Sequence, residues 1–182
     1  MNSVVAAVTP ATDDLLVVQS EPTTFFPVSL LKLTVLSFCT VGLYDIYWFY
    51  KNWKVIKLRD RSSISPALRS LFGVFFCYSL FKSMDKDLET LSGPTLSVGG
   101  LAAGWILLIL LSRLPDPYWI VTMFSFLFLL PIQSSVNRLN QLVAPEADIN
   151  ARFGAWNIAT VIVGGIFVAL AIIGTFMPPE PI

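Results

Sequence analysis

Histidine is absent from the 182 residues, and charged residues of both signs are scarce. Without histidine, the chain lacks the commonest general base, the commonest metal ligand and the usual pH switch near neutrality. Charged residues make up 13% of the chain, about half the share that soluble domains carry. The 12 basic and 12 acidic residues balance, so the basic footprint of a nucleic-acid-binding protein is missing. We therefore expect a non-catalytic protein with no cofactor, no metal site and no nucleic-acid partner.

Cysteine is also scarce, since Cys39 and Cys77 are the only two. Both lie in apolar runs, which favours buried hydrophobic roles over a disulfide framework, a zinc site or a nucleophile. Residues 1–26 contain no Lys or Arg, so they lack the positive region with which a signal peptide begins. We interpret residues 1–25 as a flexible N-terminal tail.

Hydrophobic residues make up 55% of the chain, and they gather in long runs between the charged clusters. This distribution is typical of a polytopic membrane protein. Four runs predict transmembrane helices, at about residues 67–81, 96–111, 118–132 and 155–177. We therefore predict an all-α membrane helix bundle with four transmembrane helices, a preceding membrane segment within residues 26–65, and a short tail at 178–182.

The first membrane segment is compatible with two structures. Lys32 and Asp45 leave a charge-free stretch of only 12 residues between them, from Leu33 to Tyr44, whereas a full span needs about 20 apolar residues. If both charged side chains snorkel to opposite surfaces, the segment spans the membrane. A break at Thr40-Val41-Gly42 would instead make it re-entrant, because glycine lowers helix propensity.

An aromatic and basic block follows, which predicts an amphipathic helix lying on the membrane surface. Tyr and Trp favour this interface because their rings are apolar and their tips form hydrogen bonds. In a helix, Lys51, Lys54, Lys57 and Arg61 share one side, with Phe49, Trp53 and Ile56 beside them. Simple interfacial anchoring explains the block, but anionic lipid or a protein partner would also be attracted to it. The candidate binding residues are Tyr44, Asp45, Tyr47, Trp48, Tyr50, Lys51, Trp53, Lys54, Lys57 and Arg59.

Asp45 is the one acidic residue in this block. An ionisable group near the membrane is a candidate functional residue, because its charge is costly there. We expect its carboxylate to pair with Lys51, with Lys32 or with a tyrosine hydroxyl.

Residues 66–115 and 116–177 form a weak internal repeat. An offset of 51 residues aligns Pro66 with Pro117 and Trp105 with Trp156, which predicts two helical hairpins of the same design and parallel orientation. Polar residues of the second hairpin are expected to pair with the first, to line a polar cavity or to form a solvated face; these are Asn137, Arg138, Asn140 and Asn157, with Asn150 and Arg152 just before the last span. Close helix packing is predicted at Gly100, Gly104 and Gly165.

The segment from Lys51 to Arg69 has six basic residues and one acidic residue. This bias predicts a cytoplasmic location for it. The amphipathic extensions of the two hairpins, near residues 82–91 and 134–142, would then lie on the outer side, and the C-terminus would lie inside.

The block from Thr40 to Lys54 resembles a family of uncharacterised bacterial membrane proteins, a domain of unknown function with the pattern Thr-x-Gly-x-Tyr-x-x-Tyr-Trp-x-Tyr-Lys. Residues 137–146 and 155–157 also look like members of that family. The resemblance covers roughly residues 27–177. It implies a multi-pass protein of the bacterial inner membrane, and it implies no activity.

Two functions follow as hypotheses. The first is a non-catalytic membrane component that contacts anionic lipid or a protein partner. The alternative is a small transporter or channel-like protein for a neutral or lipid-like solute. A transporter should carry charged residues near the bilayer midplane, and the middles of the four predicted spans carry none, which favours the first hypothesis. The glycine contacts also suit a homo-oligomer.

Overall fold

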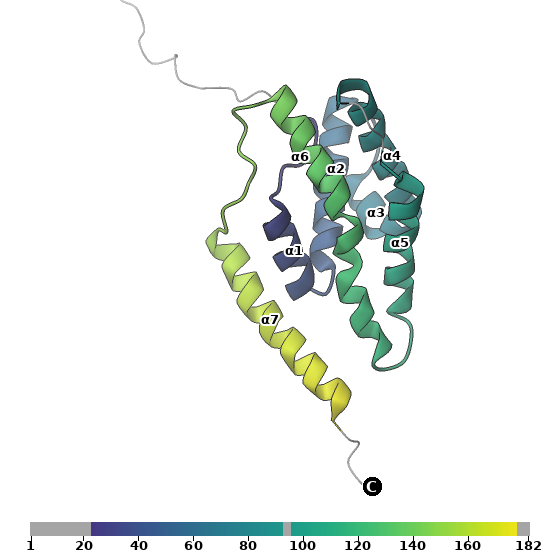
Figure 1. Cartoon of the computed structure of the whole chain (residues 1–182), viewed down its shortest axis with the longest axis vertical. Coiled ribbons are helices and arrows are strands. Elements are labelled where there is room, and N and C mark those ends of the chain that lie inside the picture. The colour runs from purple at the N-terminus through teal and green to yellow at the C-terminus, as the bar shows by residue number, and fades with distance from the viewer. Residues whose placement is uncertain (1–22, 93–95, 178–182) are drawn as a thin grey trace, which may run out of the picture.

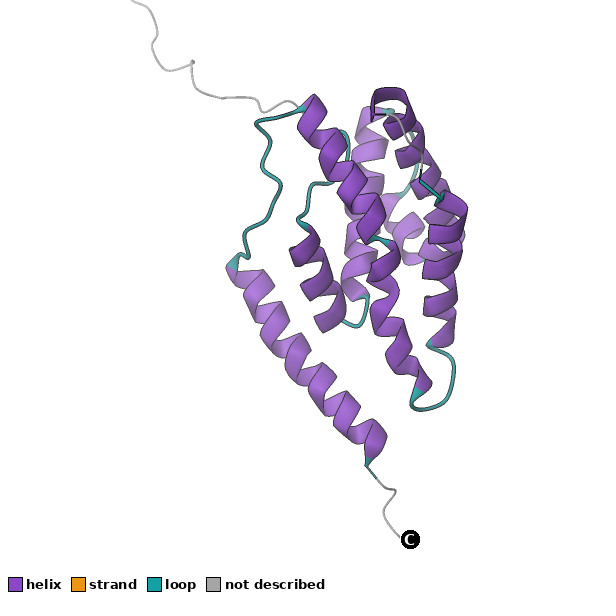
Figure 2. Ribbon diagram, in the orientation of Figure 1, coloured by secondary structure: helices purple, strands orange, loops and turns teal. Residues whose placement is uncertain are grey.

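The computed structural model describes residues 23–92 and 96–177, and within these ranges the chain is helical without a strand (Figure 2). The predicted all-α class is confirmed. The predicted tails lie outside the described residues, apart from residues 23–25 of the first. Phe25 is fully buried, so the packed part of the chain begins before residue 26.

The helices form an upright bundle with one outlying member (Figure 1). In chain order the elements are α1 (Leu30–Cys39), α2 (Leu43–Arg59), α3 (Pro66–Leu71), α4 (Gly73–Ser92), α5 (Val98–Leu111), the 3₁₀ helix η1 (Tyr118–Phe128), α6 (Leu130–Val143) and α7 (Ala155–Phe176). Helices α2, α4, α5 and the continuous η1–α6 run side by side, α1 lies at one flank, and α7 lies outermost against α1.

The chain reverses direction between α1 and α2. Val41 has φ 51° and Gly42 has φ 84°, a left-handed conformation that glycine adopts without the steric cost of a Cβ. The break falls at the predicted Thr40–Gly42 position, so residues 26–50 form two short antiparallel helices instead of one continuous helix (Figure 1). Of the two predicted structures, this geometry matches the re-entrant one.

Helix α2 is a core helix, which corrects the prediction of a helix lying on the surface. It packs against α1, α3 and α4, and Phe49, Trp53 and Ile56 are all buried. Their predicted common side is confirmed, but it faces protein. Large aromatic rings bury much apolar area, and close packing with other helices removes more of it from water than a membrane surface would.

The basic end of α2 and the extension of α4 lie at the same end of the bundle. Arg59 Nη1 donates to Asp87 Oδ2 at 2.6 Å, which overturns the prediction that these segments lie on opposite sides. The segments share an end because residues 60–72 lead the chain back only as far as the middle of the bundle before α4 begins. Gly73, at the start of α4, lies against Trp105 in the middle of α5. Helix α4 then runs outward again, toward the end where α2 finished.

The two predicted repeat units pack differently. Helix α5 packs directly on α4, as in a hairpin. In the second unit, residues 144–154 carry the chain across the flank of the bundle, and α7 lies against α1 (Figure 1). The predicted second hairpin is therefore not a packed unit, and the similarity between the units does not extend beyond the order of their helices.

Two helices are long and apolar enough to cross a membrane, judged by length and composition among the described residues. They are the continuous run Tyr118–Val143, with 26 residues, and α7, with 22. Helices α1 and α5 are apolar but have only 10 and 14 residues. Val168 is the one buried side chain of α7. A long apolar helix that is exposed along nearly its whole length is unusual in a soluble monomer and is compatible with association with a membrane.

Glycine allows two close helix contacts, of which one was predicted. A Cβ on Gly104 would overlap the Phe128 ring of η1, whereas a Cβ on Gly165 would meet nothing. Its neighbour Gly164 makes the contact instead, where a Cβ would overlap the Cys39 carbonyl oxygen. Gly100 approaches only Ser97 of its own helix start. The predictions for Gly165 and Gly100 were therefore wrong.

Substitution of Gly104 tests the packing of α5 on η1. We expect Gly104→Ala to lower the free energy of unfolding by about 1–3 kcal/mol, because the added methyl group forces Phe128 to move. The matched control is Gly99→Ala in the same helix, where a Cβ has open space and raises helix propensity. Thermal melting followed by tryptophan fluorescence measures both, and equal melting temperatures would contradict the tight contact.

Candidate functional site

The Asp45 carboxylate is fully buried and joins four helices. Ser37 Oγ of α1 donates to its Oδ1 at 2.6 Å. Its Oδ2 accepts from Ser125 Oγ of η1 at 2.9 Å and from Trp105 Nε1 of α5 at 3.2 Å. The predicted partners, Lys32, Lys51 or a tyrosine, do not form these bonds.

A buried carboxylate needs such donors, because desolvation of its oxygens is costly unless each is hydrogen-bonded. Hydrogen bonds to a charged acceptor are also stronger than those between neutral groups. The Asp45 junction, defined as Asp45 with Ser37, Trp105 and Ser125, therefore fixes the positions of α1, α2, α5 and η1 relative to one another. The side chain cannot contact lipid headgroups, so Asp45 leaves the predicted binding face.

A second polar network holds the non-helical segment at residues 25–28. Asn140 Oδ1 accepts from the Phe25 N–H, and its Nδ2 donates to the Phe25 carbonyl oxygen. Asn137 Nδ2 donates to the Val28 carbonyl oxygen at 2.8 Å, and Asn52 Oδ1 accepts from the Phe26 N–H. Asn137 and Asn140 therefore satisfy backbone groups of the N-terminal segment, where the sequence predicted pairing with the first hairpin.

Gln133 connects this network to the aromatic core. Its Oε1 accepts from Trp48 Nε1, and its Nε2 donates to Asn137 Oδ1 at 2.7 Å. Trp48 is therefore a buried structural residue. Trp53 is buried too, under the guanidinium of Arg69, so neither tryptophan belongs to an exposed binding face.

Lys32 forms the third polar cluster, where α1 meets the loop that leads into α7. Only 4% of the residue is exposed. Its ammonium donates to Asn150 Oδ1 at 2.8 Å and to the Arg152 carbonyl oxygen at 2.9 Å. Asn157, with its amide oxygen turned toward Lys32 Nζ, accepts at 3.0 Å. The three acceptors are neutral, and Asp148 acts on Lys32 through its charge without forming an ion pair.

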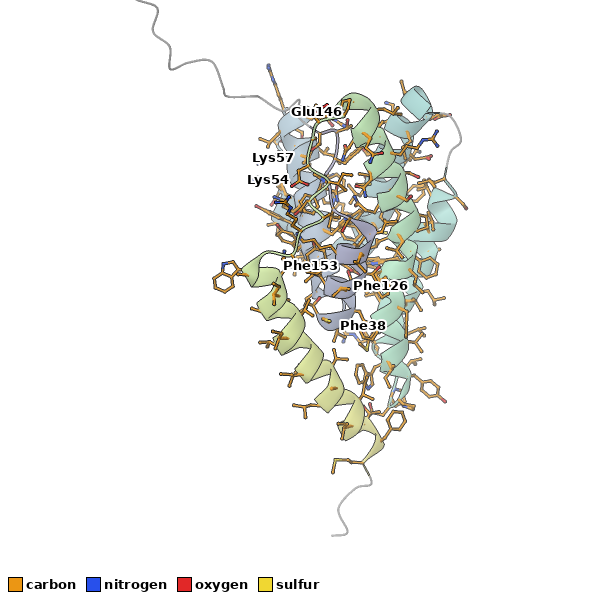
Figure 3. All side chains as sticks on the ribbon, turned by 60° about the vertical axis from the view of Figure 1, so that its left-hand side comes forward. Phe38, Lys54, Lys57, Phe126, Glu146 and Phe153 are labelled. Atoms are coloured by element: carbon orange, nitrogen blue, oxygen red, sulfur yellow. The ribbon has the colours of Figure 1, made fainter. Side chains whose placement is uncertain are left out.

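The remaining residues of the predicted binding face form a stripe along α2. Tyr44, Tyr47, Lys51 and Lys54 follow one another at helical spacing, and Lys51 Nζ lies 5.1 Å from the centre of the Phe26 ring. Figure 3 shows Lys54 and Lys57 on the side of the bundle from which the loop toward α7 departs. Tyr50 and Lys57 are half-buried beside this stripe.

Arg59 belongs to an ion-pair cluster at the end of α2. Partial burial acts to lower the pKa of its guanidinium, but hydrogen bonds and charges from Asp60 and Asp87 outweigh that effect and raise it. Because these two acids neutralise it, Arg59 adds little to the positive face. Arg138 is exposed on α6.

The sequence predicted most of the polar residues that matter and missed their partners. Ser37, Ser125 and Gln133 were not singled out. Ser125 and Gln133 are polar residues within an apolar 26-residue run, and that position was a usable signal. Ser37 gave none, since serine is common at helix ends and in loops.

A comparison of the chain with models of known protein families, with curated proteins and with solved structures finds no match in any of the three. The function is therefore inferred from the geometry of the chain itself.

Removal of the carboxylate tests the Asp45 junction. Asp45→Ala leaves three buried donors without an acceptor, and each costs about 1–3 kcal/mol, so we expect a loss of roughly 3 kcal/mol or more in the free energy of unfolding. Asp45→Asn keeps one acceptor oxygen and should lose less. Asp116→Ala, at an exposed position of the α5–η1 loop, is the control. If Asp45→Ala melts like Asp116→Ala, the junction does not hold the four helices together.

Proposed function

We propose that this chain is a non-catalytic, multi-pass protein of the bacterial inner membrane whose α2 stripe contacts anionic lipid headgroups. The stripe consists of Tyr44, Tyr47, Lys51 and Lys54, with Lys57 beside it. The location follows the resemblance of residues 40–54 to bacterial membrane proteins, together with the two helices long enough to span. A protein partner that presents acidic groups to the same face is the alternative occupant.

The distribution of surface residues supports a membrane position. Large apolar side chains are exposed over α5, η1 and α7; they include Leu107, Leu110, Val121, Phe124, Leu127, Ile162, Val163, Ile166, Phe167 and Leu170. The ends of α2, α4 and α6 carry most of the charges and lie at one end of the bundle. We place the apolar parts of α1, α2, α5 and η1 in the bilayer beside α7, with the charged ends at its surface.

The lysines of α2 are the observation that carries the proposal. In the described part of the chain, no carboxylate lies within ion-pair distance of Lys51, Lys54 or Lys57, because the ion pairs at this end involve Arg59. Lys82 and Lys86 on α4 form no ion pair with a described residue either, but Asp85, Asp87 and Glu89 lie in the same segment, so it carries no net positive charge. An unpaired basic stripe bordered by tyrosines is what an anionic membrane surface attracts.

Accessibility of single cysteines tests the orientation. In a background without Cys39 and Cys77, we expect cysteines at Arg61, Glu89 and Arg138 to react with a membrane-impermeant maleimide from the same side of the membrane. A cysteine at Asp116 should react from the opposite side. All four positions are exposed. If Glu89 instead reacts together with Asp116, the charged ends of α2 and α4 do not share one membrane surface.

Selectivity for anionic lipid tests the basic stripe. Each lysine near an anionic surface contributes about 1 kcal/mol, so Lys54→Gln with Lys57→Gln should reduce the preference for phosphatidylglycerol over phosphatidylcholine several-fold. Electron paramagnetic resonance of spin-labelled lipids around the reconstituted protein measures this preference.

The matched control replaces Lys82 and Lys86 by Gln on α4, in a segment that carries no net positive charge because Asp85, Asp87 and Glu89 lie within it. We expect little change for this variant. Equal effects of the two double substitutions would remove the argument for a specific face on α2. If neither double substitution changes the lipid selectivity, the proposal is refuted.

A further inference from the structure

An apolar groove lies between α7 and the turn that joins α1 to α2. Its volume is about 660 Å³, which falls within the range of roughly 300–1,000 Å³ that small-molecule sites occupy. One wall is the turn, with Cys39, Val41 and Leu43, and the other is the α7 face that carries Ala159, Val163 and Phe167. At Gly164 the two walls touch, because α7 packs on the Cys39 carbonyl.

A polar hollow of about 380 Å³ continues this groove toward the start of α7. Its lining consists of Phe26, Lys32, Tyr44, Tyr47, Asn150 and Asn157. On each wall, neighbouring residues line the two spaces. Leu43 lines the groove and Tyr44 lines the hollow; on α7, Trp156 lines the groove and Asn157 lines the hollow. Together they present one amphipathic surface, polar at one end and apolar along the rest.

The polar end carries positive charge and free hydroxyl donors. Among the described residues no acid lines it, and the hydrogen bonds of the Lys32 ammonium go to neutral acceptors, while the charge of Asp148 acts on it from outside the hollow. A buried cation is costly unless an anion accompanies it. Within the described residues, the hydroxyls of Tyr44 and Tyr47 have no hydrogen-bond partner, and Lys51 approaches the Tyr47 ring to 6.0 Å. Two tyrosines and the Lys32 ammonium thus line a space in which an anion fits, and the Lys51 ammonium lies near its edge.

We propose that this groove binds a single glycerophospholipid with an anionic headgroup. The phosphate lies at the polar end, between Lys32 and the hydroxyls of Tyr44 and Tyr47, and an acyl chain follows the apolar groove along α7. The orientation agrees with that of α7, whose start would lie at headgroup level if α7 spans the membrane. The inference rests on the membrane location proposed above, but it does not depend on Lys54 and Lys57.

Native mass spectrometry of protein released from nanodiscs tests this site. With equal phosphatidylglycerol and phosphatidylcholine, we expect one retained phosphatidylglycerol per chain. Ala159→Trp fills the groove and should abolish retention, whereas Ala169→Trp, at an exposed position on another side of α7, should retain the lipid.

A second pair of variants tests the polar end without changing the shape of the groove. Tyr44→Phe with Tyr47→Phe removes two hydrogen bonds to a charged group, and we expect retention to weaken by about tenfold or more. Tyr118→Phe, at an exposed position near the opposite end of the bundle, should leave it unchanged. Thermal melting of each variant verifies that it is folded.

Four results would overturn the proposal. Ala159→Trp could retain as much lipid as Ala169→Trp, or the protein could retain phosphatidylcholine as well as phosphatidylglycerol. The chain could also be released without lipid, or as a lipid-free dimer, which would assign the groove to a second copy.

Failure of the basic stripe is recognised separately. If Lys54→Gln with Lys57→Gln leaves both the retained lipid and the spin-label selectivity unchanged, the groove stands and the stripe does not.

Discussion

The arrangement of the bundle depends on one buried carboxylate. Asp45 lies where α1, α2, α5 and η1 meet, and each of its hydrogen bonds comes from a different helix. A helix that moved away would leave an oxygen of this carboxylate without a donor in an apolar surrounding, where such a loss is expensive. The junction also holds α1 against α2 and thereby places Lys32 and Cys39 at the walls of the groove. The candidate site is a consequence of this interaction.

Amide side chains have the corresponding role for the N-terminal segment. Residues 25–28 lie outside any helix, so their backbone groups cannot bond within one and must find partners elsewhere. Asn52, Asn137 and Asn140 supply those partners from α2 and α6. Asparagine suits this position because one side chain offers a donor and an acceptor, as a peptide group does. The segment thus acts as an added layer of the core, with Phe25 and Val28 fully buried.

Local sequence signals predicted local structure well. The Thr40–Gly42 break lies where expected, and Phe49, Trp53 and Ile56 share a side. Predictions that required knowledge of distant neighbours failed. The partners of Asp45 lie 8, 60 and 80 residues away, and no pattern along the chain selects Ser125 over another hydroxyl. The prediction that the α4 extension lies on the side opposite the basic segment also failed. It combined the charge bias with the assumption that each apolar run crosses the membrane completely, but residues 60–72 return only half-way along the bundle.

Helix α7 is attached to the rest of the molecule by few interactions. It touches α1 at Gly164, Asn157 near its start accepts from Lys32 Nζ, and Trp119 Nε1 donates to Thr175 Oγ1 near its far end, while nearly all its side chains face outward. A segment with so few buried contacts separates at a much smaller free-energy cost than global unfolding. The groove beside it therefore has one permanent wall and one detachable wall. An amphiphile would enter sideways from the surrounding bilayer as α7 swings outward, and the core held by Asp45 would stay intact throughout.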